Sequence, residues 1–252
     1  MSFLRHTQLM FQRSVRRALR EPAWIMIGMF QPILYLLLFA PLLDNLALPG
    51  YGDTTSLNIF VPGLLVMIAL FGLGFSGFGI LDDLRNGVLE RFHVTPANRL
   101  ALLMGMILND VILFLIQCGG LVLVATLMGF RANLAGLIVL FGLLAVLGLM
   151  VAAFSYALGL IFRDESPLAA TLNTLTLPLL LLSGVLLPLS LAPDLLQTIA
   201  EFNPFLHIVE AARALIHGDM THNSIVLAFS AVLVMLVITM QWVVSLFHRM
   251  TA

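Results

Sequence analysis

The chain has 252 residues, of which 61% are hydrophobic and only 10% are charged, and its mean hydropathy is +1.07. A soluble globular domain carries about a quarter charged residues, so this composition excludes one. The sequence therefore predicts an integral membrane protein, surrounded by membrane lipids and without a nucleic-acid partner.

Six apolar runs are long enough to cross a membrane, because a spanning helix needs about 20 residues. The runs cover residues 23–43, 59–81, 101–128, 134–162, 167–187 and 224–247. Strands of a membrane barrel would alternate in pieces of about 10 residues, and these runs do not. We predict an all-α membrane protein with one transmembrane domain over residues 1–252 and six transmembrane helices.

Residues 1–22 form a basic leader that holds Arg5, Arg13, Arg16, Arg17 and Arg20. Apolar residues recur between the arginines near helical spacing. This pattern predicts an N-terminal amphipathic helix in the cytoplasmic interface, with its arginines toward anionic headgroups. The alternative is a leader that orients the first span by charge alone.

The basic residues give the orientation, and all twelve of them are arginine. Ten lie in the leader, in loop 82–99, after the fourth span or at the C-terminus, whereas Arg131 and Arg213 lie on the other side. Basic residues in short loops stay in the cytoplasm. We expect a multi-pass protein of a prokaryotic cytoplasmic (inner) membrane, with both termini in the cytoplasm.

Loop 82–99 lies between two spans and carries acidic and basic residues at close spacing. We expect it on the cytoplasmic side, together with both termini. Val88, Leu89 and Phe92 form a short apolar ridge flanked by Glu90 and Arg91. Such an apolar centre with a polar rim is typical of a protein interface. Thr95 and Pro96 are suited to cap and start the third span. The alternative is a solvated turn that only fixes topology.

The outer region 188–223 precedes the last span. Asn203 and Pro204 open a helical pattern that runs to Gly218, since asparagine caps helices and proline suits their first position. We expect an apolar face opposite Glu210, Arg213 and His217. The expected apolar face consists of Phe205, Ile208, Val209, Ala212, Leu215 and Ile216. About 14 residues are too few to span, which suggests a re-entrant or interfacial helix that either lines an exit or closes the bundle.

Asn109 and Asp110 lie inside the third span, where an ionisable residue is a functional hypothesis by default. Asp110 either faces substrate or water, or bonds to a neighbouring helix. For the second case we expect partners in the fifth span, such as Thr171, Asn173 or Thr174. The second span holds small residues that permit close helix approach, namely Gly72, Gly74, Ser76, Gly77 and Gly79.

Enzymatic function is not expected. A chain without lysine cannot carry a P-loop, whose lysine reaches the nucleotide phosphates. The Gly-x-Ser-Gly pattern at 74–77 fits an intramembrane serine protease, but no histidine lies inside a span to serve as its base. We expect no metal site and no catalytic residue. A secondary transporter is a further alternative, although no convincing internal repeat supports it.

These features together resemble the type-2 ABC transporter permeases, closest to the daunorubicin-exporter-like and nodulation-exporter-like members. The resemblance rests on the six spans, the basic leader, the first cytoplasmic loop and the outer Asn-Pro helix, and it covers essentially the whole chain. In the loop, the residues that match the family pattern are Gly87, Glu90, Arg91, Thr95 and Pro96. Family members often have a glutamate near the start of the loop, where this chain has Asp82 and Asp83.

The resemblance implies a half-transporter that forms a homodimer and is driven by two copies of a separate ATP-binding-cassette subunit. That subunit would bind ATP and magnesium, and this chain would hold no cofactor. Loop 82–99 would form the coupling helix against the ATPase, and a re-entrant hairpin would precede the last span. The expected function is ATP-driven export of a hydrophobic or amphiphilic, drug- or antibiotic-like molecule. An exporter of a polysaccharide or lipid-linked glycan is the alternative.

The orientation is tested by cysteine labelling. A Glu90→Cys variant is expected to react with a membrane-impermeant maleimide only after the cells are opened, because its loop is cytoplasmic. An Arg131→Cys variant should react in intact cells. Labelling of position 90 from outside intact cells would reverse the orientation.

Overall fold

The computed structural model describes residues 22–44, 56–85, 99–185 and 192–251. The predicted amphipathic leader, apart from Pro22, lies outside the described residues, and so do residues 86–98 of the loop. All regular structure within the described ranges is helical. The helices are α2 (Pro22–Asp44), α3 (Ser56–Ile68), the π-helix η1 (Ala69–Leu73), α4 (Gly77–Arg85), α6 (Arg99–Leu127), α7 (Leu134–Phe162), α8 (Glu165–Leu181), α9 (Asp194–Glu201), α10 (Pro204–His217) and α11 (Asn223–Thr251).

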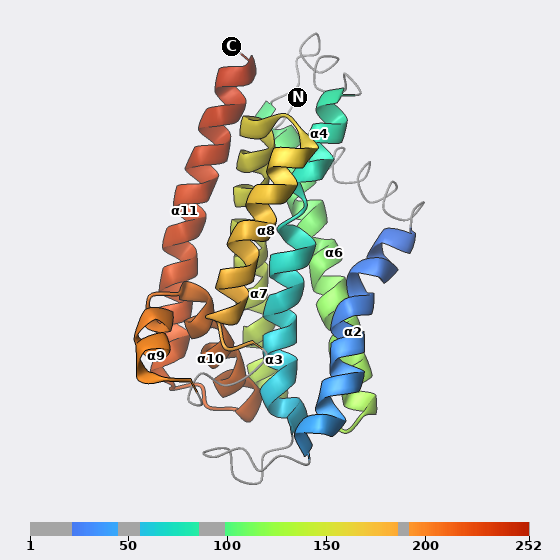
Figure 1. Cartoon of the computed structure of the whole chain (residues 1–252), viewed down its shortest axis with the longest axis vertical. Helices are drawn as coiled ribbons and strands as arrows, with labels where there is room; N and C mark the ends of the chain where they lie inside the picture. Colours follow the sequence, from blue (N-terminus) through green and yellow to red (C-terminus); the bar gives the residue numbers. More distant parts are fainter. Residues whose placement is uncertain (1–21, 45–55, 86–98, 186–191, 252) are drawn as a thin grey trace.

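The long helices run side by side between two ends of an elongated bundle (Figure 1). One end, which we name the Arg85 end, holds the last turn of α4, the first turn of α8 and the C-terminus. The other end, the α10 end, holds α9, α10 and the first turn of α3 (Figure 1). The chain therefore changes direction between successive long helices, as successive membrane passes do.

Four helices of the described chain are long and apolar enough to cross a membrane, judged by length and composition. They cover Leu57–Arg85, Leu103–Leu127, Leu134–Phe162 and Asn223–Arg249. The other two predicted spans are also helical: the first is α2, with 23 residues (Pro22–Asp44), and the fifth is α8, with 17 residues. The structure thus supports a polytopic helical membrane protein. At least four of the six predicted spans coincide with helices that have the length and hydropathy needed to cross a membrane.

The fifth predicted span, residues 167–187, ends earlier than we predicted. α8 stops at Leu181, and residues 182–185 form a turn in which Gly184 has a φ of 66°. Pro178 lies one turn before that end, and a proline inside a helix removes one backbone hydrogen bond. Seventeen helical residues cover only about 25 Å, less than the hydrocarbon core of about 30 Å.

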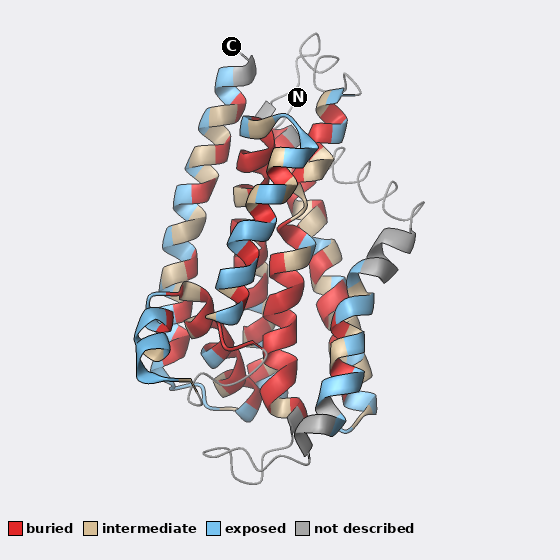
Figure 2. Ribbon diagram, viewed as in Figure 1, coloured by how far each residue is buried: buried red, intermediate tan, exposed pale blue. Residues whose placement is uncertain are grey.

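α7 is the central helix of the bundle, since it contacts α4, α6, α8, α10 and α11. Its second half is almost continuously buried. α3 is likewise buried on nearly all sides, whereas α2, α8 and α11 expose one face (Figure 2). Those exposed faces carry large apolar residues, among them Phe30, Leu37 and Leu38 of α2 and Val226, Val234 and Val237 of α11. In a membrane protein such faces suit lipid or a second subunit.

The second span is interrupted between η1 and α4. At this break the hydroxyl of Ser155 in α7 donates a hydrogen bond to the carbonyl of Gly74 and accepts one, at 2.8 Å, from the amide of Gly77. A Cβ at Gly77 would lie 2.3 Å from the Ser155 carbonyl oxygen, and one at Gly159 would lie 2.7 Å from the Gly77 carbonyl oxygen. The close helix approach predicted for this segment is confirmed at Gly77.

Alanine substitutions at two glycines of this segment are expected to differ. Gly77→Ala forces α4 away from α7 and should cost about 1–3 kcal/mol of stability, as overpacking does. Gly72→Ala places its Cβ 3.6 Å from Gln117 Oε1, an ordinary contact, and should be close to neutral. Thermal unfolding of the detergent-solubilised protein measures both. Equal melting temperatures for the two variants would contradict the close approach.

Candidate functional site

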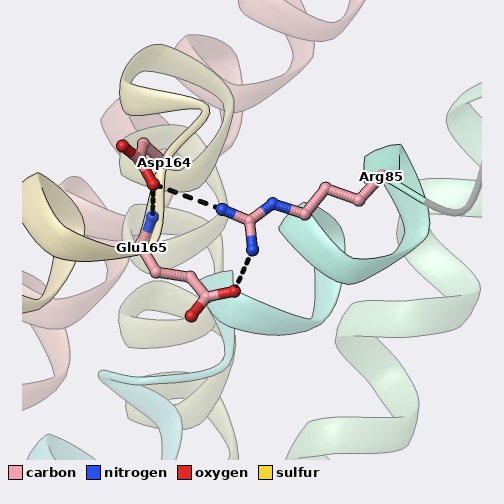
Figure 3. Close-up of polar contacts among 3 residues, drawn as sticks. All are labelled: Arg85, Asp164 and Glu165. Carbon is pink, nitrogen blue, oxygen red and sulfur yellow. Dashed lines mark hydrogen bonds and ion pairs between the residues drawn. The ribbon is translucent and has the colours of Figure 1, made fainter.

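The Arg85 end is held by an ion-pair cluster that joins two turns of the chain (Figure 3). Arg85 is the last residue of α4, and its guanidinium contacts Asp164 Oδ1 at 3.2 Å and the carboxylate of Glu165. Asp164 is also the N-cap of α8, since its Oδ1 accepts the amide hydrogen of Glu165 at 2.7 Å. The cluster therefore connects the start of loop 86–98 to the turn between α7 and α8.

That turn has a backbone geometry that side chains rarely adopt. Arg163, the C-cap of α7, has a φ of 52°, in the left-handed region. Its amide still donates to the Gly159 carbonyl at 3.1 Å, so the last turn of α7 is closed. Because the chain reverses sharply at Arg163, the next two residues, Asp164 and Glu165, face Arg85 (Figure 3).

The cluster is a positioning contact more than a source of stability. The side chains of Arg85, Asp164 and Glu165 are 51%, 64% and 56% exposed. Exposed pairs of this kind contribute about 0–1 kcal/mol, because water and salt screen them. Two contacts from one planar guanidinium nevertheless fix a direction as well as a distance. No local sequence pattern indicates this cluster, because its partners are 79 and 80 residues apart in the chain.

The predicted interface residues of the loop itself lie outside the described residues and stay a prediction. They are Gly87, Val88, Leu89, Glu90, Arg91, Phe92, Thr95 and Pro96. The described flanks of the loop are the end of α4 and the start of α6 at Arg99.

Asp110 is joined to a neighbouring helix, but to a different one from the helix we expected. The hydroxyl of Tyr156 in α7 donates to Asp110 Oδ2 at 2.8 Å, and Asn109 Nδ2 donates to Asp110 Oδ1 at 3.2 Å. The expected partners Asn173 and Thr174 instead donate to carbonyls of their own helix, α8. A tyrosine hydroxyl inside an apolar run needs a polar partner. The position of Tyr156 in the fourth predicted span was therefore the sequence feature that could have indicated this pairing.

The α10 helix begins and ends where the sequence predicts. Asn203 caps it, with Oδ1 accepting the Phe205 amide hydrogen at 3.1 Å, and Pro204 is its first residue. Gly218 ends it with a φ of 85°. Asn203 also donates through Nδ2 to the Leu179 carbonyl of α8 at 2.9 Å. The predicted apolar face is buried, and α10 packs against α3, α7 and α11.

The prediction for the opposite face was wrong at Arg213. Glu210 and His217 are exposed as expected, but Arg213 is only 9% exposed. Its guanidinium donates to the carbonyls of Ile59 in α3, at 3.1 Å, and of Gly184, at 2.7 Å.

The broken end of α8 explains this burial. Carbonyls at a helix end lack intrahelical partners, and a buried one is costly unless a donor reaches it. A Cβ at Gly63 would lie 2.5 Å from the Val185 carbonyl oxygen, so the turn after α8 is pressed against α3. Arg213 holds α10, α3 and that turn together, a role that helix periodicity does not reveal.

Two substitutions on α10 test this role, since each removes one charge with little change in size. Arg213→Met removes the guanidinium donor from the carbonyls of Ile59 and Gly184 and should lower the free energy of unfolding by about 1–3 kcal/mol or more. Glu210→Gln changes an exposed side chain and should be nearly neutral. Thermal unfolding in detergent gives both values. A neutral Arg213→Met variant would show that the guanidinium bonds do not hold this end.

Taken together, the fold and these sites define a polytopic helical membrane protein whose helices pack around α7. The chain belongs to the ABC-2 type transporter family, because the model of that family matches residues 5–217. Members of this family are permeases that work with an ATP-binding-cassette ATPase partner.

Curated relatives agree with this assignment. A daunorubicin resistance ABC transporter permease, DrrB1 of Streptomyces coeruleorubidus, is 28% identical over 201 residues, which cover 78% of this chain and 70% of the relative. The putative transport permease ycf38 of Cyanophora paradoxa is 30% identical over 216 residues, covering 84% and 74%. The ycf38 protein of Pyropia yezoensis is 29% identical over 217 residues, covering 85% and 75%.

Proposed function

We propose that this chain is the permease subunit of an ATP-driven exporter that moves a hydrophobic or amphiphilic, drug-like molecule out of the cytoplasm or inner leaflet. Two copies would form a homodimer and work with two copies of a separate ATPase subunit, which binds ATP and magnesium. Membership of the ABC-2 family carries the transport function. The similarity to a daunorubicin resistance permease supports the drug-like substrate.

The arginine distribution supports the proposed orientation. Arg85, Arg163 and Arg249 all lie at one end of the bundle, at or next to the ends of α4, α7 and α11. Arg131 lies near the opposite end, where the amide of Asn133 donates to the Ile216 carbonyl of α10. Since basic residues favour the cytoplasmic side, the Arg85 end would face the cytoplasm of a prokaryotic inner membrane, with both termini there.

The Arg85 cluster supports a coupling role for loop 82–99. A protein that docks on the loop would displace the end of α4, because the loop follows α4 directly in the chain. Through Arg85 the same displacement would reach Asp164 and Glu165 at the start of α8. A single docking event at the loop would thus act on two membrane helices. This arrangement suits a subunit that receives force from a cytoplasmic ATPase.

Two substitutions in the loop test this coupling. Phe92→Ala removes an aromatic anchor and should weaken ATPase binding by about 2 kcal/mol or more, about thirtyfold in affinity. Glu90→Arg reverses a charge at the rim and should hinder recognition while leaving insertion intact, because it strengthens the positive-inside bias. Pull-down of the ATPase subunit and substrate efflux measure both variants.

The control is Arg131→Ala, which removes a charge from the opposite side and should leave pull-down and efflux unchanged. All three variants are expected in the membrane at near-normal levels. Normal efflux in both loop variants would mean that residues 82–99 are a topological connector and that the ATPase docks elsewhere.

A further inference from the structure

The carboxylate of Asp110 faces the interior of the bundle. In α6 it shares one helical stripe with Phe114, Gln117 and Leu121, at spacings of four, seven and eleven residues, and those three are buried. The exposed large apolar residues of α6 lie on the other side of the helix, namely Ile112, Ile116, Leu123 and Leu127. Asp110 itself remains partly exposed. Its carboxylate therefore lies on the inward side of α6.

The hydrogen bonds around Asp110 leave it able to accept more. Tyr156 donates to one carboxylate oxygen and Asn109 to the other, so both oxygens act as acceptors, as in an ionised carboxylate. Both donors are neutral. In the described part of the chain, no arginine or histidine forms an ion pair with Asp110. Each oxygen keeps a second lone pair for another donor.

A second polar atom beside Asp110 lacks a partner. Asn109 is only 5% exposed, and within the described ranges its Oδ1 is buried without a hydrogen-bond donor. A buried carbonyl oxygen in this condition costs free energy until a donor arrives. Two adjacent residues of α6 thus both offer acceptor atoms, at a depth where polar groups are rare.

Gly79 of α4 and Gly72 of η1 lie beside Tyr156 and Gln117. A Cβ at Gly79 would lie 3.9 Å from the Tyr156 hydroxyl, and one at Gly72 would lie 3.6 Å from Gln117 Oε1. Both are ordinary contact distances, so these glycines are not required by close packing as Gly77 is.

We propose that Asp110, held by Tyr156 and flanked by Asn109, binds the positively charged amine of a cationic amphiphile. The ammonium N–H groups would donate to the carboxylate and to the Asn109 carbonyl oxygen, and the apolar part of the molecule would lie against residues such as Phe114. A buried charge is tolerated when an opposite charge and hydrogen bonds meet it. The inference rests on the proposed export function and names its substrate class.

The test uses two fluorescent probes, a dansyl-labelled long-chain alkylamine and its N-acetylated counterpart, in which a small neutral amide replaces the charged amine. Binding of each to the purified chain in detergent is measured by fluorescence, and ATP-dependent uptake into inverted vesicles containing the chain with its ATPase is measured in parallel. Asp110→Asn should lower the amine-to-acetyl ratio about tenfold or more in both assays, as expected for a hydrogen bond to a charged group. Asp110→Glu should restore part of the ratio.

The control is Asp194→Asn, which removes the same charge from an exposed position at the start of α9 and should leave the ratio unchanged. An equal fall for both probes, or no fall for either, in Asp110→Asn overturns the inference and leaves export intact. Charge-selective binding without ATP-dependent uptake by the unmodified chain supports the amine site and contradicts the exporter.

Discussion

The bundle depends on one hydroxyl, that of Ser155, which repairs the interrupted second span. In a membrane interior every backbone polar group needs a partner from the protein. The π-helix at Ala69–Leu73 and the turn after it disturb the regular ladder, and Ser155 meets both the Gly74 carbonyl and the Gly77 amide. Because Ser155 belongs to the central helix, this repair fixes the second span against α7, around which the other helices pack.

At the α10 end, larger side chains supply the hydrogen bonds that backbone carbonyls lack. There α8 stops short, and its last turns leave carbonyls inside the protein. Asn203 reaches the Leu179 carbonyl and Arg213 reaches the Gly184 carbonyl. Asn203 is the N-cap of α10 and Arg213 lies within that helix, so two hydrogen bonds join α10 to the end of α8 and to the turn that follows it. The burial of a charged residue, Arg213, on α10 is thereby explained by packing.

Hydropathy and capping patterns predicted the local structure well. The helix from Pro204 to His217 was foreseen with both caps, and residues 134–162 form one helix as predicted. Contacts between distant segments could not be foreseen, because no local pattern encodes the partner. The pairing of Asp110 with Tyr156, the burial of Arg213 and the early end of α8 all depend on which helices become neighbours. Of the predicted sites, the loop residues stay predictions, while the described polar residues gained partners that the sequence did not name.

The polar contacts along α7 differ in strength in a way that bears on movement. At mid-bundle the Ser155 bonds are buried, and losing one would leave backbone groups unsatisfied at about 1–3 kcal/mol each. At the Arg85 end the ion pairs are half-exposed and contribute about 0–1 kcal/mol. A force applied at the loop would therefore shift the Arg85 end, where α4 and the α7–α8 turn are joined, before it separated the second span from α7. The contacts around Ser155 are therefore the stronger ones, and those at the Arg85 end are the weaker ones. The hydrogen bond between Asp110 and Tyr156 joins α6 to α7 one residue from Ser155.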